Sequence, residues 1–159
     1  MAFTNYSYTE IGDVDAGVIN GVLPYKVDTY TANYNAPLNT GKFAIIKSGN
    51  LANMDRTDTP VVAGLVLQSM VNAIENGETF VKTGEGAVYQ VDVVSWGLAT
   101  VAVKSGDTPA KFGAIYAVNS GVVDADLGKA TTTPTNNVAV KGYFNREIKT
   151  GVWEVFIQL

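Results

Sequence analysis

The 159-residue sequence contains no cysteine and no histidine. Without cysteine there are no disulfides, so packing and backbone hydrogen bonds must hold the fold. The two absences together exclude Ser-His-Asp and Cys-His catalysis and the usual zinc, haem and iron–sulfur ligand sets. An enzyme built from this chain would depend on carboxylate, lysine, serine or threonine chemistry. We therefore expect no cofactor, no bound metal and no catalytic residue.

Charge is also scarce. Charged residues make up 16% of the chain, below the roughly 25% of an average soluble domain, and hydrophobic residues make up 47%. A chain with so little charge can carry large protein-facing surfaces. The formal net charge is −4 and the pI is about 4.7. No net positive field draws in nucleic acid or anionic lipid, so we expect neither as a partner.

The N-terminal residues, MAFTNYSYTEIGD, lack the basic region and the continuous apolar region of a secretory signal. No apolar run in the chain approaches the length of a membrane span. The sequence is that expected of a soluble protein made in the cytoplasm.

Pairs of acidic residues are the main candidates for catalysis or metal binding. They lie in predicted loops or beside glycine, and are Asp13 with Asp15, Asp55 with Asp58, and Asp124 with Asp126. None continues into the ligand pattern of a calcium-binding EF-hand loop. Aspartate is a preferred turn residue that bonds its own backbone, so solvated turn residues are the favoured interpretation. A carboxylate hydrolase stays open as a third choice of function, because glycosidase carboxylates need not be close in sequence.

The sequence after residue 40 has the rhythm of an all-β protein. Short runs rich in valine, isoleucine, phenylalanine and tyrosine alternate with glycine, asparagine, aspartate and proline. The predicted strands are residues 42–47, 61–69, 78–83, 88–94, 98–104, 114–118, 138–145 and 152–159. Asn76-Gly77 fits a hairpin turn, although Gly77 could equally end a short helix. Short links between so many strands predict a small antiparallel β-barrel or β-sandwich.

The last predicted strand has the clearest alternation. Trp153, Val155, Ile157 and Leu159 share one face, which we expect to be buried. A turn at Thr150-Gly151 should join this strand to residues 138–145 as a closing antiparallel hairpin.

Residues 1–40 differ from the rest, because they have no sustained helical or strand period. They hold five of the eight tyrosines and only one cation. We predict an extended N-terminal arm over residues 1–40 and a β-barrel body over residues 41–159. Disordered segments are poor in aromatics, so these side chains should meet a partner surface. The predicted interface residues are Phe3, Tyr6, Tyr8, Tyr25, Tyr30 and Tyr34. The alternative is that the arm packs on its own body as an edge strand.

Four stretches give the body a resemblance to a known family. They are VVAGLV at residues 61–66, NGETFV at 76–81, FGAIYAVNSGV at 112–122 and VWEVFIQL at 152–159. In this order they resemble the phage capsid decoration proteins, also called structural cement proteins, which are small β-barrel proteins on the outside of icosahedral heads. The resemblance covers about three quarters of the chain.

The resemblance implies a non-enzymatic protein of the virion that binds the outer surface of the capsid. Its partner would be the major capsid protein, and the chain would form a homo-trimer or cluster on the shell. This protein would be made in the host cytoplasm. The alternative function is a β-sandwich glycan-binding module of a tail fibre or adhesin, in which Trp96 or Trp153 stacks on a sugar, although core or interface anchoring is favoured for both.

Overall fold

The computed structural model describes residues 16–21, 23–33, 38–56, 58–67, 88–121 and 123–159. Over these residues the chain forms ten strands and one short 3-10 helix. In order they are β1 (Lys26–Asn33), β2 (Phe43–Lys47), β3 (Asn50–Asn53), β4 (Val62–Val66), β5 (Val88–Ala102), β6 (Ile115–Ala117), η1 (Asp124–Asp126), β7 (Ala130–Thr131), β8 (Val138–Val140), β9 (Gly142–Lys149) and β10 (Val152–Gln158). In the described part of the chain, no helix has the length and apolarity that a membrane crossing requires.

Five strands close into a barrel in the order β1-β3-β2-β4-β5, because β1 also pairs with β5. The β1–β3 pairing is parallel, and the other pairings of the barrel are antiparallel. Closure leaves this part of the sheet without a free edge. The prediction of a small all-β barrel is confirmed.

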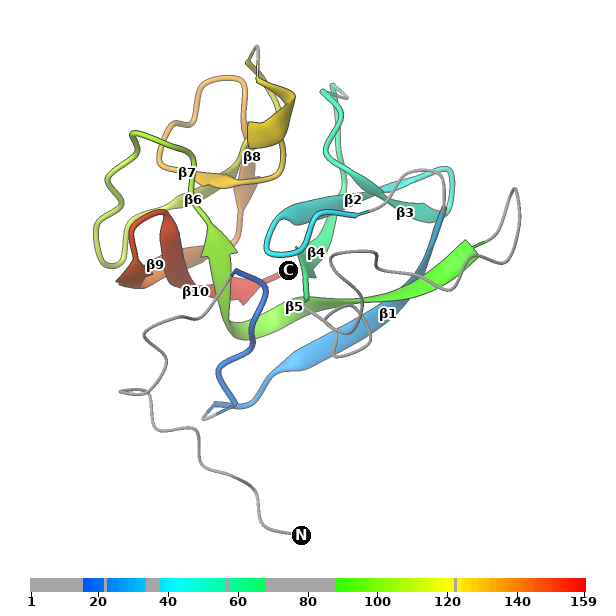
Figure 1. Cartoon of the computed structure of the whole chain (residues 1–159), viewed down its shortest axis with the longest axis horizontal. Coiled ribbons are helices and arrows are strands. Elements are labelled where there is room, and N and C mark those ends of the chain that lie inside the picture. The colour runs from blue at the N-terminus through cyan, green and yellow to red at the C-terminus, as the bar shows by residue number, and fades with distance from the viewer. Residues whose placement is uncertain (1–15, 22, 34–37, 57, 68–87, 122) are drawn as a thin grey trace, which may run out of the picture.

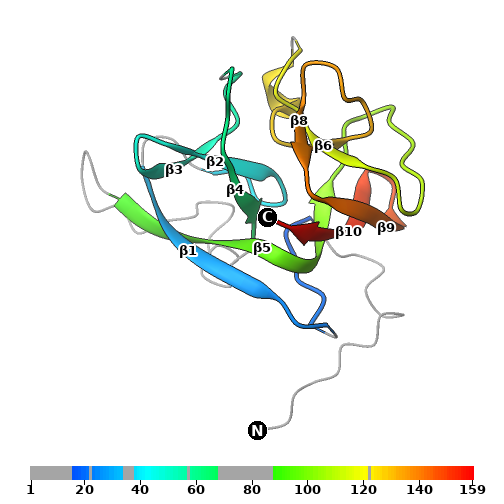
Figure 2. The same ribbon diagram turned by 180° about the vertical axis from the view of Figure 1, so that it is seen from behind.

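The long strand β5 joins the barrel to the rest of the molecule (Figures 1 and 2). Its first part pairs with β1 and β4, and its last seven residues pair with β10. At the junction Gly97 has a φ of +122°, and a Cβ there would lie 2.8 Å from the Tyr25 Cβ. Glycine is required at this point because the backbone of residues 24–25 approaches so closely.

Beyond the barrel, β10 and β9 extend the sheet from β5, and β7-β6-β8 form a separate three-stranded sheet. Figure 1 shows the barrel strands and the β6–β9 region as two lobes, with β5 passing from one into the other and β1 along its lower side. Residues 16–20 lie along the other edge of the last part of β5, where Ile19 bridges to Ala99. This part of β5 is therefore covered on one edge by residues 16–20 and on the other by β10.

Two apolar clusters form the core. One takes a residue from each barrel strand and fills the barrel, with Ala32, Ala44, Leu51, Ala63 and Val93 among its members. The larger one packs the barrel against the second lobe, with Phe43, Leu65, Ile115, Phe144 and Val155 among its members. In β2, Phe43 and Ile45 join the second cluster, whereas Ala44 and Ile46 contact the first. The alternation in β2 thus divides one strand between two cores.

Several strand predictions hold, and others are corrected. Residues 42–47, 61–69, 114–118 and 152–159 correspond to β2, β4, β6 and β10, and the closing antiparallel hairpin of β9 and β10 is confirmed. The predicted strands 88–94 and 98–104 are instead one strand, because Gly97 stays in the ladder opposite Ile157. The predicted strand 138–145 corresponds to two strands, β8 and the start of β9, which belong to different sheets. Strand 78–83 and the Asn76-Gly77 turn lie outside the described residues.

The predicted inward face of the last strand is partly wrong. Val155 and Ile157 are fully buried, but Leu159 is 43% exposed beyond the end of β10. On the opposite face Glu154 is buried, because residues 16–20 and β9 contribute side chains that cover it.

Part of the predicted N-terminal arm belongs to the barrel. Residues 26–33 form β1 and pair with β5 from Lys26↔Trp96 to Asn33↔Val88. The sequence left open that the arm packs on its own body as an edge strand. Residues 26–33 do pack on the body, but β1 is paired on both sides within the barrel and is not an edge strand. The division of the chain at residue 40 stays a prediction.

Candidate interaction surface

Four aromatic side chains make a continuous row across β5, β10, β9 and the loop before β6. Trp96 meets Phe156 edge-on, with ring centroids 5.5 Å apart, and Tyr143 stacks on Phe156 at 5.4 Å. Phe112 extends the row from Tyr143, again with centroids 5.4 Å apart. We call Trp96, Phe156, Tyr143 and Phe112 the aromatic row. Such pairs add stabilisation beyond the area that they bury.

Phe112 ends the row and is the most exposed of its members. Its side chain is 69% exposed, and the Lys111 Nζ lies 5.1 Å from the ring centroid. Its φ is +65°, a conformation that costs a non-glycine residue on the order of 1–3 kcal/mol. The Phe112 N–H donates to the Phe144 carbonyl at 2.7 Å, and the Phe144 N–H donates to the Gly113 carbonyl at 3.1 Å. The fold thus holds an aromatic ring in water at a cost in backbone strain.

Tyr25 lies beside the opposite end of the row. It is 53% exposed, and its Cβ packs against Gly97, the residue after Trp96. Large apolar side chains that remain in water are typical of protein interfaces, where tyrosine, tryptophan and phenylalanine are enriched. The arrangement can bind a protein surface by burying flat aromatic area.

The other predicted interface residues fall in different places. Tyr30, in β1, is half-buried and packs against the apolar cluster inside the barrel. Phe3, Tyr6, Tyr8 and Tyr34 lie outside the described residues. The sequence does not reveal a surface of Tyr143, Phe156 and Phe112, because these residues come from separate elements and meet only in the fold. One available signal was the period of β10, which places Phe156 opposite the core residues Val155 and Ile157.

The two tryptophans have different environments. Trp153 packs against the larger core cluster and meets Phe144 edge-on, with ring centroids 5.7 Å apart. Trp96 belongs to the aromatic row and is half-buried. Trp153 is thus a core anchor, and Trp96 is the tryptophan that a bound molecule could contact.

Glu154 is a buried carboxylate close to the aromatic row. Its residue is 1% exposed, and it lies two positions before Phe156 on the same face of β10. The Asn20 Nδ2 donates to its Oε2 at 3.0 Å, and the Asn145 Nδ2 donates to its Oε1. The Arg146 Nε lies 3.4 Å from Oε1. Burial raises the pKa of Glu154 from 4.5 to about 7, because the charged form loses its hydration.

The predicted acidic pairs are held mainly in contacts with cations. Asp55 pairs with Lys47, and Asp126 pairs with Lys129 at 2.8 Å. Asp13 and Asp15 lie outside the described residues. Over the part of the chain that the structure describes, no three acidic, histidine or cysteine side chains gather as metal ligands would.

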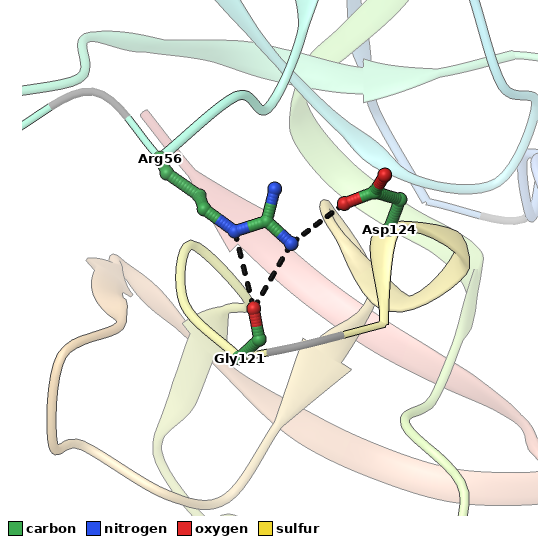
Figure 3. Close-up of polar contacts among 3 residues, drawn as sticks. All are labelled: Arg56, Gly121 and Asp124. Atoms are coloured by element: carbon green, nitrogen blue, oxygen red, sulfur yellow. Dashed lines mark hydrogen bonds and ion pairs between the residues drawn. The ribbon is translucent and has the colours of Figure 1, made fainter.

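Asp124 belongs to a contact between the two lobes. The Arg56 Nη2 lies 2.6 Å from the Asp124 Oδ1. The Nε and Nη2 of Arg56 also donate hydrogen bonds to the Gly121 carbonyl, at 3.1 and 2.9 Å (Figure 3). Arg56 follows β3. Gly121 lies between β6 and η1, and Asp124 is the first residue of η1. An open polar cleft of about 440 Å³ lies beside this contact, and Asn119, Asn137 and Val138 form part of its wall. The cluster fastens the barrel to the second lobe.

Comparison with known proteins places this fold among phage capsid structures. The chain is similar to a chain of the solved structure described as the capsid of Myoviridae Phage XM1. The TM-score is 0.78, the sequences are 28% identical, and the match covers 99% of this chain and 98% of the other. The resemblance to capsid-associated phage proteins is confirmed, and a structural role related to a phage capsid is supported. No protein-family model and no curated protein matches the chain.

Proposed function

We propose that this chain is a non-enzymatic decoration, or cement, protein that binds the outside of a phage head and stabilises contacts between major capsid subunits. The observation that carries the proposal is the similarity to a capsid chain over nearly the full length of both proteins. A full-length match means that the barrel and the second lobe both have counterparts in that chain. The absence of histidine and cysteine from the sequence agrees with a structural role.

The aromatic row supplies a docking face for this function. Three of its rings are presented on the strands β5, β10 and β9, so little side-chain freedom is lost when a partner covers them. Phe112 with Lys111 ends the face on one side, and the exposed Tyr25 lies next to Gly97 near its other end. We propose that this face contacts the shell. Phe3, Tyr6, Tyr8, Tyr30 and Tyr34 remain proposed capsid or subunit contacts, and the homo-trimer or cluster remains a proposed assembly.

The proposal is tested with expanded, undecorated heads of the phage that encodes this chain. Purified protein is added, and binding and head survival on heating are measured. We expect saturable binding and heads that survive to a higher temperature. Heads that bind no protein would contradict the function.

A truncated chain separates the contribution of the N-terminal residues. The truncation should remove only residues 1–15, because a longer one would remove the residue 16–20 contacts or barrel strand β1. Weaker binding by the truncated chain would support a shell contact in residues 1–15. Equal binding would leave the shell contacts to residues 16–159, which include the aromatic row.

A second candidate function is the glycan-binding module, because Trp96 and its neighbours form an aromatic surface on which a sugar ring could stack. Specific signals on a glycan array that disappear in Trp96→Ala would favour it. A clean array together with binding to heads would favour the decoration protein.

A further inference from the structure

Glu154 joins the β9–β10 hairpin to a segment that is distant in sequence. Its two oxygens accept hydrogen bonds from Asn20 and from Asn145, which lie 134 and 9 residues away along the chain. Asn20 ends the segment of residues 16–20 that lies on β5. Glu154 thereby gives β10 a side-chain contact with this segment.

The backbone of the segment is fixed on the strand next to Glu154. Gly17 N–H donates to the Thr100 carbonyl at 2.6 Å, and Asn20 N–H donates to the Leu98 carbonyl at 2.9 Å. Thr100 N–H returns a bond to the Val18 carbonyl at 2.8 Å. In the β5–β10 ladder, Thr100 is the residue opposite Glu154. Lifting residues 16–20 from β5 would therefore remove Asn20 and let water reach the carboxyl group.

Among the residues that the structure describes, few charged groups surround Glu154. Residues 16–20 contribute no titratable side chain, and neither does Thr100 on β5. On β9 the facing charge is Arg146, opposite Glu154 in the ladder and 45% exposed at its side chain. On β10 the same-face neighbours Val152 and Phe156 carry no charge. Arg146 and the N–H donors of Asn20 and Asn145 favour the ionised carboxylate, whereas the burial of Glu154 favours its protonated form.

We propose that Glu154 is a proton-controlled latch that holds residues 16–20 closed while its carboxyl group is protonated and favours their release when it ionises. The closed segment keeps water from the carboxyl group, and the open segment restores hydration of the charge. Closing therefore takes up a proton and opening releases it, so higher pH favours opening. The burial that raises the pKa of Glu154 to about 7 sets the change near neutral pH. The latch concerns the isolated chain, so it stands or falls independently of shell binding.

The test is hydrogen exchange at the Gly17 and Asn20 amides of the purified full-length protein, followed between about pH 5.5 and pH 8.5 and corrected for intrinsic exchange rates. If opening restored the ordinary pKa, protection would fall by up to about thirtyfold over this range. We expect a fall of about tenfold, because Asn145 and Arg146 stay in place after the segment opens. The amide of Val155 in the β9–β10 hairpin serves as an internal reference for global unfolding.

Two variants test whether the pH dependence of protection comes from Glu154. In Glu154→Gln, which cannot ionise, the protection of Gly17 and Asn20 should no longer depend on pH. In Glu147→Gln, which removes an exposed carboxylate of the same hairpin, the wild-type dependence should persist. The same pH dependence in Glu154→Gln as in the wild type would overturn the latch. An NMR titration of the wild-type Glu154 carboxyl carbon gives a check without any variant: a midpoint near 7 agrees with the latch, and one near 4.5 overturns it.

Discussion

Phe112 and Glu154 depart from ordinary residue preferences in opposite directions. An aromatic ring is held in water at a positive φ, and a carboxylate is enclosed with a raised pKa. Each departure carries a free-energy cost, and such costs tend to persist where a residue has a task other than folding. Phe112 belongs to the proposed docking face, and Glu154 controls the proposed latch. Phe112 gives a prediction about binding to heads, and Glu154 gives a prediction about the pH dependence of stability.

Glu154 should make the protein less stable as the pH rises. Its pKa is raised from 4.5 to about 7 in the folded chain. Its contribution to stability is thus fully present below about pH 4.5 and is lost as the pH rises through about 7. The loss should be on the order of 3 kcal/mol in the free energy of unfolding. Urea unfolding at several pH values measures it.

Controls isolate this residue. The loss should disappear in Glu154→Gln and persist in Glu147→Gln. The pKa of Asp28 is lowered, mainly by a hydrogen bond from Ser95 and then by Lys26. Asp28 therefore changes the free energy of unfolding only at pH values below this range. Stability that is flat in wild-type protein from about pH 5 to pH 8 would contradict the burial of an ionisable Glu154.

Phe112→Asn should weaken binding to heads without unfolding the protein. Asparagine tolerates a positive φ better than phenylalanine and removes the exposed ring. We expect the free energy of unfolding to change by less than about 1 kcal/mol and the affinity for undecorated heads to fall about tenfold or more. Val61→Asn is the matched control, because Val61 is 65% exposed and lies outside the aromatic row. Equal losses of binding in both variants would remove Phe112 from the docking face.

At the scale of strands, the alternation of apolar and polar residues predicted those strands whose pattern is local. It found β2, β4, β6 and β10, whose apolar residues recur with the period of a strand. It missed β1, where Tyr30 and Ala32 are the inward side chains of a mostly polar run that is held by pairing with the distant β5. It did not reveal the burial of Glu154, because pattern does not show that residues 16–20 return along β5 and bring Asn20 to this side chain. Contacts of this kind depend on topology rather than on local preference.

Gly142, the first residue of β9, gives a prediction at this scale. Its φ is +148°, and a Cβ there would lie 2.0 Å from the Phe156 carbonyl oxygen. Gly142→Ala should therefore destabilise the fold by about 3 kcal/mol or more, from overpacking and strain together. Gly151→Ala is the control, because Gly151 has a φ of +78° and open space around it, and should cost only about 1 kcal/mol. Thermal unfolding compares the two, and similar losses would show that the contact with Phe156 does not matter.

At the scale of the whole molecule, the chain is a barrel and a second lobe fastened along β5 and by Arg56. The sequence predicted the all-β class and the resemblance to capsid proteins, because both depend on short strand motifs. The aromatic row could not be predicted, since Trp96, Phe112, Tyr143 and Phe156 come together only when β5, β9 and β10 pair. The row, the full-length similarity to a capsid chain and the aromatic N-terminal residues all support attachment to a shell.

The measurement that tests attachment most directly is quantitative mass spectrometry of purified phage particles. A decoration protein repeats over the shell, so the account predicts this chain at a copy number on the order of that of the major capsid protein. Particles washed free of loosely bound protein should keep it. Its absence from such particles, or its presence at only a few copies per particle, would contradict the account.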